Sequence, residues 1–212
     1  MPTELEDVKH QVAVDNRVLS EMGLTTGATA ALGHASMRMP SDSGKFAIKG
    51  RGYKIDVLSR VLPEEMVVCD LNGSQVEGLP GLTPCYEIKM HSCIYRDRPE
   101  VQSIVHVHPR YTVVMSVLQK TLVPMCPEGI ELVRHPLPVY PHNKLILSDE
   151  DGTEVAEALG DAPAVLLLGH GAATVGKDLM ESVINMFNLE AQARMHWSAY
   201  CASGPPPAQI PG

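Results

Sequence analysis

The sequence lacks the features that mark several large classes of protein. Its 212 residues include only nine aromatic side chains and five cysteines, none of them in a Cys-x-x-Cys pair. An odd number of widely spaced cysteines predicts neither a disulfide framework nor a zinc knuckle, so we expect reduced thiols. The longest apolar runs, such as Ala164 to Leu168, are far shorter than the ~20 residues that a membrane-spanning helix needs.

The chain also lacks a surplus of basic residues. Seventeen Lys and Arg stand against 25 Asp and Glu, which gives a formal net charge of −8. Nucleic acids and anionic membrane surfaces attract basic proteins, so neither is expected as a partner. The segment from Met1 to Asp7 is acidic and has neither the basic nor the apolar region of a secretory signal. These observations predict a cytoplasmic protein.

The composition is that of an ordinary globular protein. Hydrophobic residues make up 44% and charged residues 20% of the chain, and this length can bury a core without disulfide or metal staples. Without an internal repeat or a dividing linker, we expect one domain over residues 1–203. The Pro-rich tail, residues 204–212, is expected to form no regular structure.

Periodicity and turn residues predict alternating helices and strands. Apolar residues at helical spacing indicate a helix from Leu5 to Met22, ended by Gly23. Strands are expected over residues 34–39, 46–48, 66–70, 75–77, 103–108, 164–168 and 172–175, with a turn at 41–44 and a loop at 50–52. Further helices are expected over 84–96, 110–120 and 153–159 and after Asp178, and the Pro-rich stretch 124–141 is expected to be irregular.

Histidines are the unusual abundance, with nine in the chain. His106 and His108 occupy alternate positions of an expected strand, so their side chains share one face about 6–7 Å apart and can converge on one ion. The alternative is a pair of satisfied core histidines. His170 lies between two glycines after an apolar strand, in a turn that permits close approach. Three imidazoles with one open position are typical of a catalytic metal site.

Glu87 is a candidate proton donor or acceptor, or a displaceable metal ligand. It lies on an expected helix, where an exposed glutamate is otherwise part of a solvated face. His91, one helical turn later, either orients that carboxylate or packs as a structural histidine. His142 and Tyr140, in the Pro-rich loop, either reach the site or are surface groups.

One block of the sequence resembles the class II aldolase and adducin family. It consists of Glu87, His91, Ile94-Tyr95, Arg98-Pro99-Glu100-Val101 and Ile104 to Pro109. In that family a catalytic glutamate lies nineteen residues before the first histidine of a His-x-His pair, as Glu87 does before His106. A third ligand lies in a later His-Gly turn, which matches His170-Gly171.

The resemblance implies a fold, a cofactor and an assembly. The fold would be a three-layer α/β/α sandwich around a central mixed, mainly antiparallel sheet. One divalent metal ion per chain, Zn²⁺ or Mn²⁺, would be held by His106, His108 and His170, with Glu87 as the catalytic residue. The protein would act on a small-molecule substrate as a homotetramer with sites at subunit interfaces.

The chain departs from the sugar-phosphate aldolases of that family where they hold phosphate. Those enzymes typically have Gly-Asn-(Ile/Val)-Ser, then Thr-Pro-Ser/Thr-Gly, and Ser-Ser before the catalytic glutamate. This chain has Gly33 to Ser36, then Lys49 to Gly52, and Cys85-Tyr86 before Glu87. The compact hydroxyl donors are missing, whereas Arg51 offers a planar fork suited to a carboxylate. The expected substrate-binding residues are His34, Ser36, Lys49, Arg51 and Tyr86.

These departures favour the non-phosphate branch of the family. We expect a metal-dependent carbon–carbon lyase that decarboxylates a non-phosphorylated hydroxy-aromatic or oxo acid through a metal-stabilised enolate. One alternative is a class II aldolase that cleaves a hydroxy-oxo acid or a sugar phosphate, because both reactions need a cation beside a developing carbanion. The other is a non-catalytic, adducin-like scaffold, which typically loses the metal ligands.

Overall fold

A computed structural model describes residues 2–52 and 56–203. Its helices are α1 (Glu4–Glu21), α2 (Ile88–Asp97), α3 (Arg110–Val117), α4 (Ile130–Val133), α5 (Asp149–Leu159) and α6 (Leu179–Ser203), with short 3-10 turns at Gly27–Thr29, Leu58–Arg60 and Pro63–Glu65. Its strands are β1 (His34–Met39), β2 (Asp42–Arg51), β3 (Met66–Asp70), β4 (Gln75–Glu77), β5 (Thr83–Pro84), β6 (Ser103–Val107), β7 (Val139–Tyr140), β8 (Ala164–Leu167) and β9 (Gly171–Gly176).

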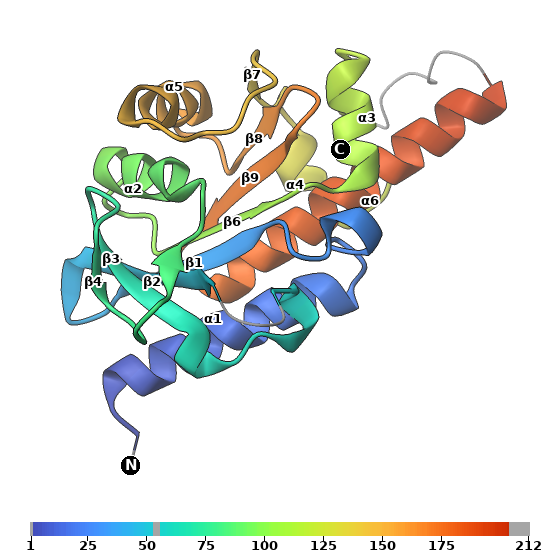
Figure 1. Cartoon of the computed structure of the whole chain (residues 1–212). Helices are drawn as coiled ribbons and strands as arrows, with labels where there is room; N and C mark the ends of the chain where they lie inside the picture. Colours follow the sequence, from blue (N-terminus) through green and yellow to red (C-terminus); the bar gives the residue numbers. More distant parts are fainter. Residues whose placement is uncertain (1, 53–55, 204–212) are drawn as a thin grey trace.

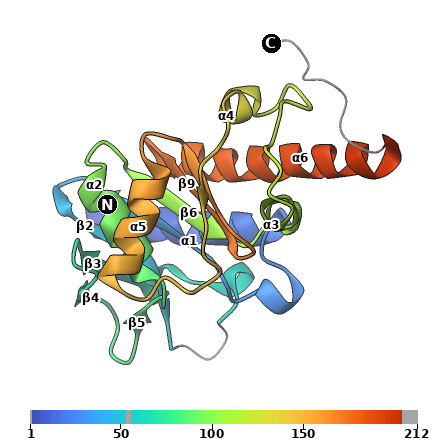
Figure 2. The same cartoon turned by 90° about the horizontal axis from the view of Figure 1, so that it is seen from above.

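The strands form one mixed sheet between two layers of helices. Their order is β4-β3-β2-β1-β6-β9-β8-β7, β5 pairs with β2, and every pairing except that of β7 with β8 is antiparallel. Helices α2 and α5 cover one face, and α1 and α6 cover the other (Figures 1 and 2). The expected three-layer α/β/α sandwich with a mainly antiparallel sheet is confirmed.

Helix α1 follows the apolar stripe that predicted it. Thr3 and Glu6 form a capping box at its start, and Val8, Val12 and Leu19 are buried at helical spacing. The helix ends before Gly23, whose φ of 83° is the left-handed conformation that suits glycine after a helix. The buried stripe packs α1 against β1 and β2.

Strand β6 lies at the centre of the sheet and is fully buried. Val105 and Val107 belong to the core cluster on the α1 and α6 side, whereas Ile104 belongs to the cluster on the α2 and α5 side. Because side chains alternate along a strand, His106 faces the α2 side, as the pattern predicted. On the neighbouring strand β1, His34 pairs directly with His106.

The expected helix 84–96 begins later than predicted. Thr83 and Pro84 form strand β5, paired with Arg51 and Gly50 of β2, and the helix starts at Ile88. Proline suits the first turn of a helix, which misled the local prediction. A pairing with residues more than 30 positions earlier in the chain decides the conformation instead.

Other boundaries also differ from the predicted ones. Strand β2 includes Gly50 and Arg51, expected in a loop, because they pair with β5, and its preceding turn is at 40–41 rather than 41–44. Helix α3 ends at Val117 because Gln119 adopts a left-handed φ of 51°. Helix α5 begins at Asp149 because Ser148 and Asp151 form a capping box.

Two further expectations concern the Pro-rich tail and membrane-spanning helices. The tail, residues 204–212, lies outside the described residues. In the part of the chain that the structure describes, no helix is both long and apolar enough to cross a membrane.

Candidate metal centre

Four side chains from distant parts of the sequence meet on the α2 side of the sheet. Glu87, His106, His108 and His170 each offer one ligand atom, and these atoms lie within 4.8 Å of one another. The three imidazole rings have centroids 4.9 to 5.1 Å apart. The structure therefore brings together the set that the sequence pattern selected.

The ligand-bearing segments are held by close backbone contacts. His106 lies in β6, His108 just after its end, and His170 in the tight turn between β8 and β9. A Cβ atom on Gly171 would lie only 2.5 Å from the carbonyl oxygen of Val107, so this approach of β9 to β6 requires glycine.

The turn that carries His170 is fixed by its neighbours. Gly169 adopts a left-handed φ of 64°. Its amide donates to the hydroxyl of Ser116 (3.0 Å), and its carbonyl accepts from the side chain of Asn143 (3.4 Å). Helix α3 and the loop after β7 therefore set the position of His170.

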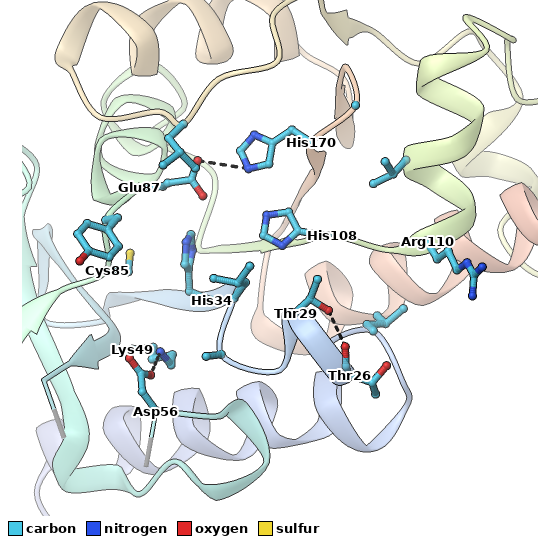
Figure 3. A pocket seen from close by; sticks show the side chains of 18 of the residues that line it. Thr26, Thr29, His34, Lys49, Asp56, Cys85, Glu87, His108, Arg110 and His170 are labelled. Atoms are coloured by element: carbon cyan, nitrogen blue, oxygen red, sulfur yellow. Dashed lines mark hydrogen bonds and ion pairs between the residues drawn. The ribbon is translucent and has the colours of Figure 1, made fainter. Parts of the chain in front are cut away.

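Glu87 stands at the N-terminus of α2 without capping it. Its side chain accepts no hydrogen bond from the first turn of the helix and instead accepts one from the backbone amide of Ile146 (3.1 Å). Its carboxylate oxygens lie 3.3 Å from Nε2 of His106 and 3.5 Å from Nε2 of His170. Figure 3 marks the contact with His170. The sequence placed Glu87 within a helix, whereas it is the residue before the first turn.

The unpaired nitrogens of the cluster fit a divalent metal ion. His106 donates from Nδ1 to the carbonyl of Ala172 (3.0 Å), which leaves the Nε2 lone pair on the side of Glu87. Among the described residues, Nε2 of His106, Nδ1 of His108 and both ring nitrogens of His170 are buried without a hydrogen-bond partner. Such buried groups are costly unless something binds them. Three imidazoles and a carboxylate can hold zinc or manganese.

The electrostatics around Glu87 and His108 favour the protonation states of these two side chains that bind metal. Burial raises the pKa of Glu87, but the neighbouring imidazoles of His106, His170 and His34 outweigh it, and the net pKa lies well below the ordinary value. Burial, followed by the charges of His106 and His170, lowers the pKa of His108 to about 3. A carboxylate and neutral imidazoles are the forms that coordinate a cation.

The cluster borders a cavity of about 990 Å³. Figure 3 shows Glu87, His108 and His170 on one side, with Cys85, Lys49 and Asp56 on another. Figure 3 also shows Arg110, whose side chain extends away from the histidines. A space of this size accommodates a small organic substrate.

Four of the five expected substrate-binding residues line this cavity: His34, Lys49, Arg51 and Tyr86. The Arg51 guanidinium lies over the Tyr86 ring, 3.6 Å from its centroid, and donates to the carbonyl of Pro84. Lys49 is buried and forms an ion pair with Asp56.

Ser36 does not line the cavity, contrary to the expectation from sequence. It is fully buried, and its hydroxyl lies 2.7 Å from Nδ1 of His91 and 2.8 Å from the hydroxyl of Tyr95. His34 and Ser36 are two positions apart in β1, so their side chains share one face of the sheet. Ser36 is covered by His91 and Tyr95 of α2, whereas His34, at the start of the strand, lines the cavity.

His91 and His142 also lie apart from the carboxylate. His91 contacts His34 and Ser36 rather than Glu87, because it points from α2 toward β1. His142 is exposed, packs against the ring of Tyr140 and is not part of the cavity wall. Tyr140 is buried and donates to Glu154, so it is not the surface group that the sequence suggested.

Sequence reasoning missed several residues of the site. Asp56, Arg110 and Asn143 line the cavity, and the Ile146 amide holds Glu87. Arg110 follows His108 by two positions, so its place after a ligand could have drawn attention to it. Asp56 and Ile146 carry no local signal, because their roles depend on residues that approach only in the folded chain.

Comparisons with known proteins agree with this arrangement. Residues 11–197 match the model of the Class II Aldolase and Adducin N-terminal domain. A 3,4-dihydroxyphthalate decarboxylase from Terrabacter sp. (strain DBF63) is 30% identical over 196 residues, which cover 89% of this chain and 79% of the relative.

Aldolases are similar as well. An L-fuculose phosphate aldolase from Methanococcus maripaludis is 29% identical, over 78% of this chain and 84% of that protein. The crystal structure of L-fuculose-1-phosphate aldolase from Thermus thermophilus superposes with a TM-score of 0.76 at 29% identity, over 97% of this chain and 98% of the other.

Proposed function

Since the chain belongs to the class II aldolase and adducin family, we propose that it is a divalent-metal-dependent lyase that releases CO₂ from a small carboxylic acid. The substrate would be a non-phosphorylated hydroxy-aromatic or oxo acid. One observation carries the proposal: the cluster of Glu87, His106, His108 and His170 borders a cavity whose wall holds Arg51 and Tyr86.

The relatives support the coarser part of this proposal. They include a decarboxylase at 30% identity and an aldolase at 29%, and both names denote enzymes that cleave carbon–carbon bonds. Together they support a lyase of the class II aldolase type. The choice of decarboxylation rests on the residues of this chain.

His106, His108 and His170 would hold the metal ion, with Glu87 beside it. A divalent ion bound there supplies a Lewis acid that stabilises negative charge beside the breaking bond. The protein positions the ligands before any substrate arrives, because His106 is fixed by Ala172 and the His170 turn is fixed by Ser116 and Asn143.

Glu87 would move the proton that the reaction needs. Its carboxylate borders the cavity beside the histidines, so it would accept a proton from a substrate hydroxyl. When the carbon–carbon bond breaks and CO₂ leaves, the same carboxyl group can return that proton to the carbon. The hydrogen bond from Ile146 holds one carboxylate oxygen while the other stays available.

The opposite wall would bind the substrate carboxylate. Arg51 presents a planar guanidinium that is braced on Tyr86, and such a fork matches two carboxylate oxygens. His34 also lines the cavity, and its ring centroid lies 5.2 Å from that of His106. Lys49 is compensated by Asp56, which makes its charge less available to a phosphate group.

The aldolase alternative has its own support. Lysine and arginine side chains line the cavity, and the L-fuculose phosphate aldolase relative acts on a phosphorylated sugar by name. In that case Glu87 would move a proton between carbon and oxygen, and an aldehyde would be released. The scaffold alternative is less well supported, because all four candidate ligands are present.

The first test measures metal content. Elemental mass spectrometry on the purified protein should find about one divalent ion per chain, and a variant with His106→Ala and His108→Ala should lose it. The matched control is His142→Ala, which removes an exposed histidine outside the cavity wall. Absence of metal from the wild type after reconstitution with zinc and manganese would contradict the proposal.

The second test separates the reactions. The metal-loaded protein is incubated with 3,4-dihydroxyphthalate and with L-fuculose 1-phosphate, while CO₂ and aldehyde are assayed in parallel. Release of CO₂ without aldehyde supports the decarboxylase, whereas aldehyde from the sugar phosphate supports the alternative.

The homotetramer with sites at subunit interfaces stays a prediction from the resemblance to the family. Light scattering tests it directly, since the chain mass is 23.0 kDa. A mass near that of one chain would contradict it.

A further inference from the structure

A continuous line of buried side chains leads from the cavity into the space between β1 and α2. Nδ1 of His34 lies 2.7 Å from Nε2 of His91, whose Nδ1 lies 2.7 Å from the hydroxyl of Ser36. That hydroxyl lies 2.8 Å from the hydroxyl of Tyr95. All four side chains are buried, and only His34 lines the cavity.

The hydrogens of this line can run in two directions. In the first, Tyr95 donates to Ser36, Ser36 donates to Nδ1 of His91, and Nε2 of His91 donates to Nδ1 of His34. His34 then carries its proton on Nε2. In the second, each hydrogen bond is reversed, and Nε2 of His34 is a bare acceptor.

The Tyr95 hydroxyl, at the inner end of the line, decides between the two directions of the hydrogen bonds. Among the described residues, the Tyr95 hydroxyl contacts the Ser36 hydroxyl and the backbone of Ile104, and Ile104 lowers the pKa of Tyr95 as an amide donor does, so the second direction leaves a buried O–H without an acceptor. An unpaired buried donor is rare and carries the full desolvation penalty, which favours the first direction by about tenfold or more.

We propose that His91, Ser36 and Tyr95 are positioning residues that hold His34 with its proton on Nε2, so that His34 presents a hydrogen-bond donor to an anionic oxygen of the substrate. The substrate contact rests on the proposed function, whereas the tautomer does not. This role explains why Ser36 lies behind the cavity wall: it acts through His91 rather than on the substrate.

The line orients a donor and does not supply the proton of the reaction. If His34 released its Nε2 proton, each donor would shift by one place and a buried tyrosinate would remain. Burial raises the pKa of Tyr95 far above its ordinary value, although the charge of Arg38 acts in the opposite direction. The proton that replaces CO₂ therefore comes from Glu87 or from water.

Histidine NMR tests the tautomer without any assay of activity. Long-range ¹H–¹⁵N spectra of histidine-labelled protein show which ring nitrogen carries the proton. In the wild type, both His34 and His91 should be protonated on Nε2. Protonation of both rings on Nδ1 would overturn the proposal.

Two substitutions at His91 sharpen the test. His91→Gln keeps a donor toward His34 and an acceptor toward Ser36, so His34 should keep its proton on Nε2. His91→Glu offers only acceptors, so a proton should move to Nδ1 of His34. If His91→Glu does not fold, the wild type and His91→Gln still decide the question. Loss of the Nε2 proton in His91→Gln would overturn the proposal.

A binding measurement tests the substrate contact. The probe is 3,4-dihydroxybenzoate, titrated calorimetrically into the zinc-loaded protein. His91→Gln should bind it within about twofold of the wild type, and His91→Glu about tenfold more weakly, since the cavity loses a neutral donor. The matched control, His142→Gln, should leave both tautomer and affinity unchanged.

The outcomes separate this inference from the proposed function. Equal affinity in the wild type and in His91→Glu would overturn the contact with an anionic oxygen. A protein that releases no CO₂ would overturn the proposed function, yet an Nε2 proton on His34 that responds to His91→Glu would still establish the positioning line.

Discussion

The two walls of the cavity are built in different ways. On the metal side, His106, His108 and His170 come from a central strand and a tight turn, and several of their ring nitrogens have no partner in the described structure. On the proposed substrate wall, Arg51 and Lys49 are already paired, with Tyr86 and Asp56. The metal wall is therefore held in place by the sheet but has ring nitrogens without partners, whereas the charged groups of the substrate wall are paired with one another or with a ring.

This difference teaches how one scaffold can serve several reactions. The positions of the three histidines depend on β6 and on the Gly169 to Gly171 turn. A substitution that moved them would therefore also disrupt the sheet. Arg51 and Tyr86 lie beside strand ends and loops, where substitutions are tolerated more easily. We therefore expect the metal wall to determine whether the chemistry occurs, and the substrate wall to determine which molecule undergoes it.

The largest expected effect is on the metal wall. Glu87→Gln keeps the shape of the side chain but removes its charge and its ability to accept a proton, so kcat should fall about 10²- to 10⁴-fold. The metal content should stay near that of the wild type. If Glu87→Gln decarboxylates the substrate as fast as the wild type does, Glu87 is not the proton carrier.

Removal of the metal ion should destabilise the folded chain, because the ring nitrogens of the metal wall then lose their partner. Because the ion binds the folded chain, a chelator should lower the free energy of unfolding by about 3 kcal/mol when the free metal exceeds its Kd about 100-fold. Differential scanning calorimetry with and without chelator measures the shift. The variant with His106→Ala and His108→Ala is the control, and a chelator should leave its Tm unchanged.

Acid should lower the free energy of unfolding through His91, which lies buried behind the metal wall. Burial and the charge of His106 lower the pKa of His91 to about 3, from an unfolded value of 6.5. Its contribution to stability is therefore complete above pH 6.5 and is lost as the pH falls toward 3. Between pH 6.5 and 5 this one group should reduce the free energy of unfolding by about 2 kcal/mol.

Urea denaturation of the metal-free protein at both pH values measures the loss. His91→Gln, which does not titrate, should show a shallower dependence on pH. An equal slope in both proteins would show that His91 does not contribute to the acid sensitivity.

The smallest effect is expected on the substrate wall. Arg51→Lys keeps the charge but loses the planar fork and the stacking on Tyr86, so KM for a carboxylated substrate should rise about tenfold while kcat changes little. Steady-state kinetics measures the two constants. The control is Arg60→Lys, an exposed arginine outside the cavity lining. A large fall in kcat at Arg51 would remove the distinction between the walls.

Local sequence predicted much of the metal wall. The alternation of His106 and His108 around Val107 fixed which side chains share a face of the sheet, and the two glycines around His170 indicated a turn that allows close approach. The resemblance to the family, in which a glutamate lies nineteen residues before the first histidine of the pair, completed the candidate set with Glu87. The first two features each depend on a few neighbouring residues, so a local pattern in the sequence is enough to predict them.

The substrate wall and the line behind it were harder to predict. Pro84 pairs with Gly50, Lys49 pairs with Asp56, and Ser36 contacts His91 across 55 residues of sequence. None of these partners can be inferred from local periodicity. The sequence allows two interpretations of His91 and predicts Ser36 at the substrate, because the distance between β1 and α2 is not encoded in local spacing.

The sequence by itself determined the alternating helices and strands, the net negative charge and the residue types that can hold a metal ion, because these depend on composition and short-range spacing. Only the tertiary structure decided that His34, His91, Ser36 and Tyr95 form one buried line and that Arg51 rests on Tyr86. The physical reason is the direction and short range of such contacts: hydrogen bonds and ring stacking act over a few ångströms, so they exist only where folding has brought distant segments together.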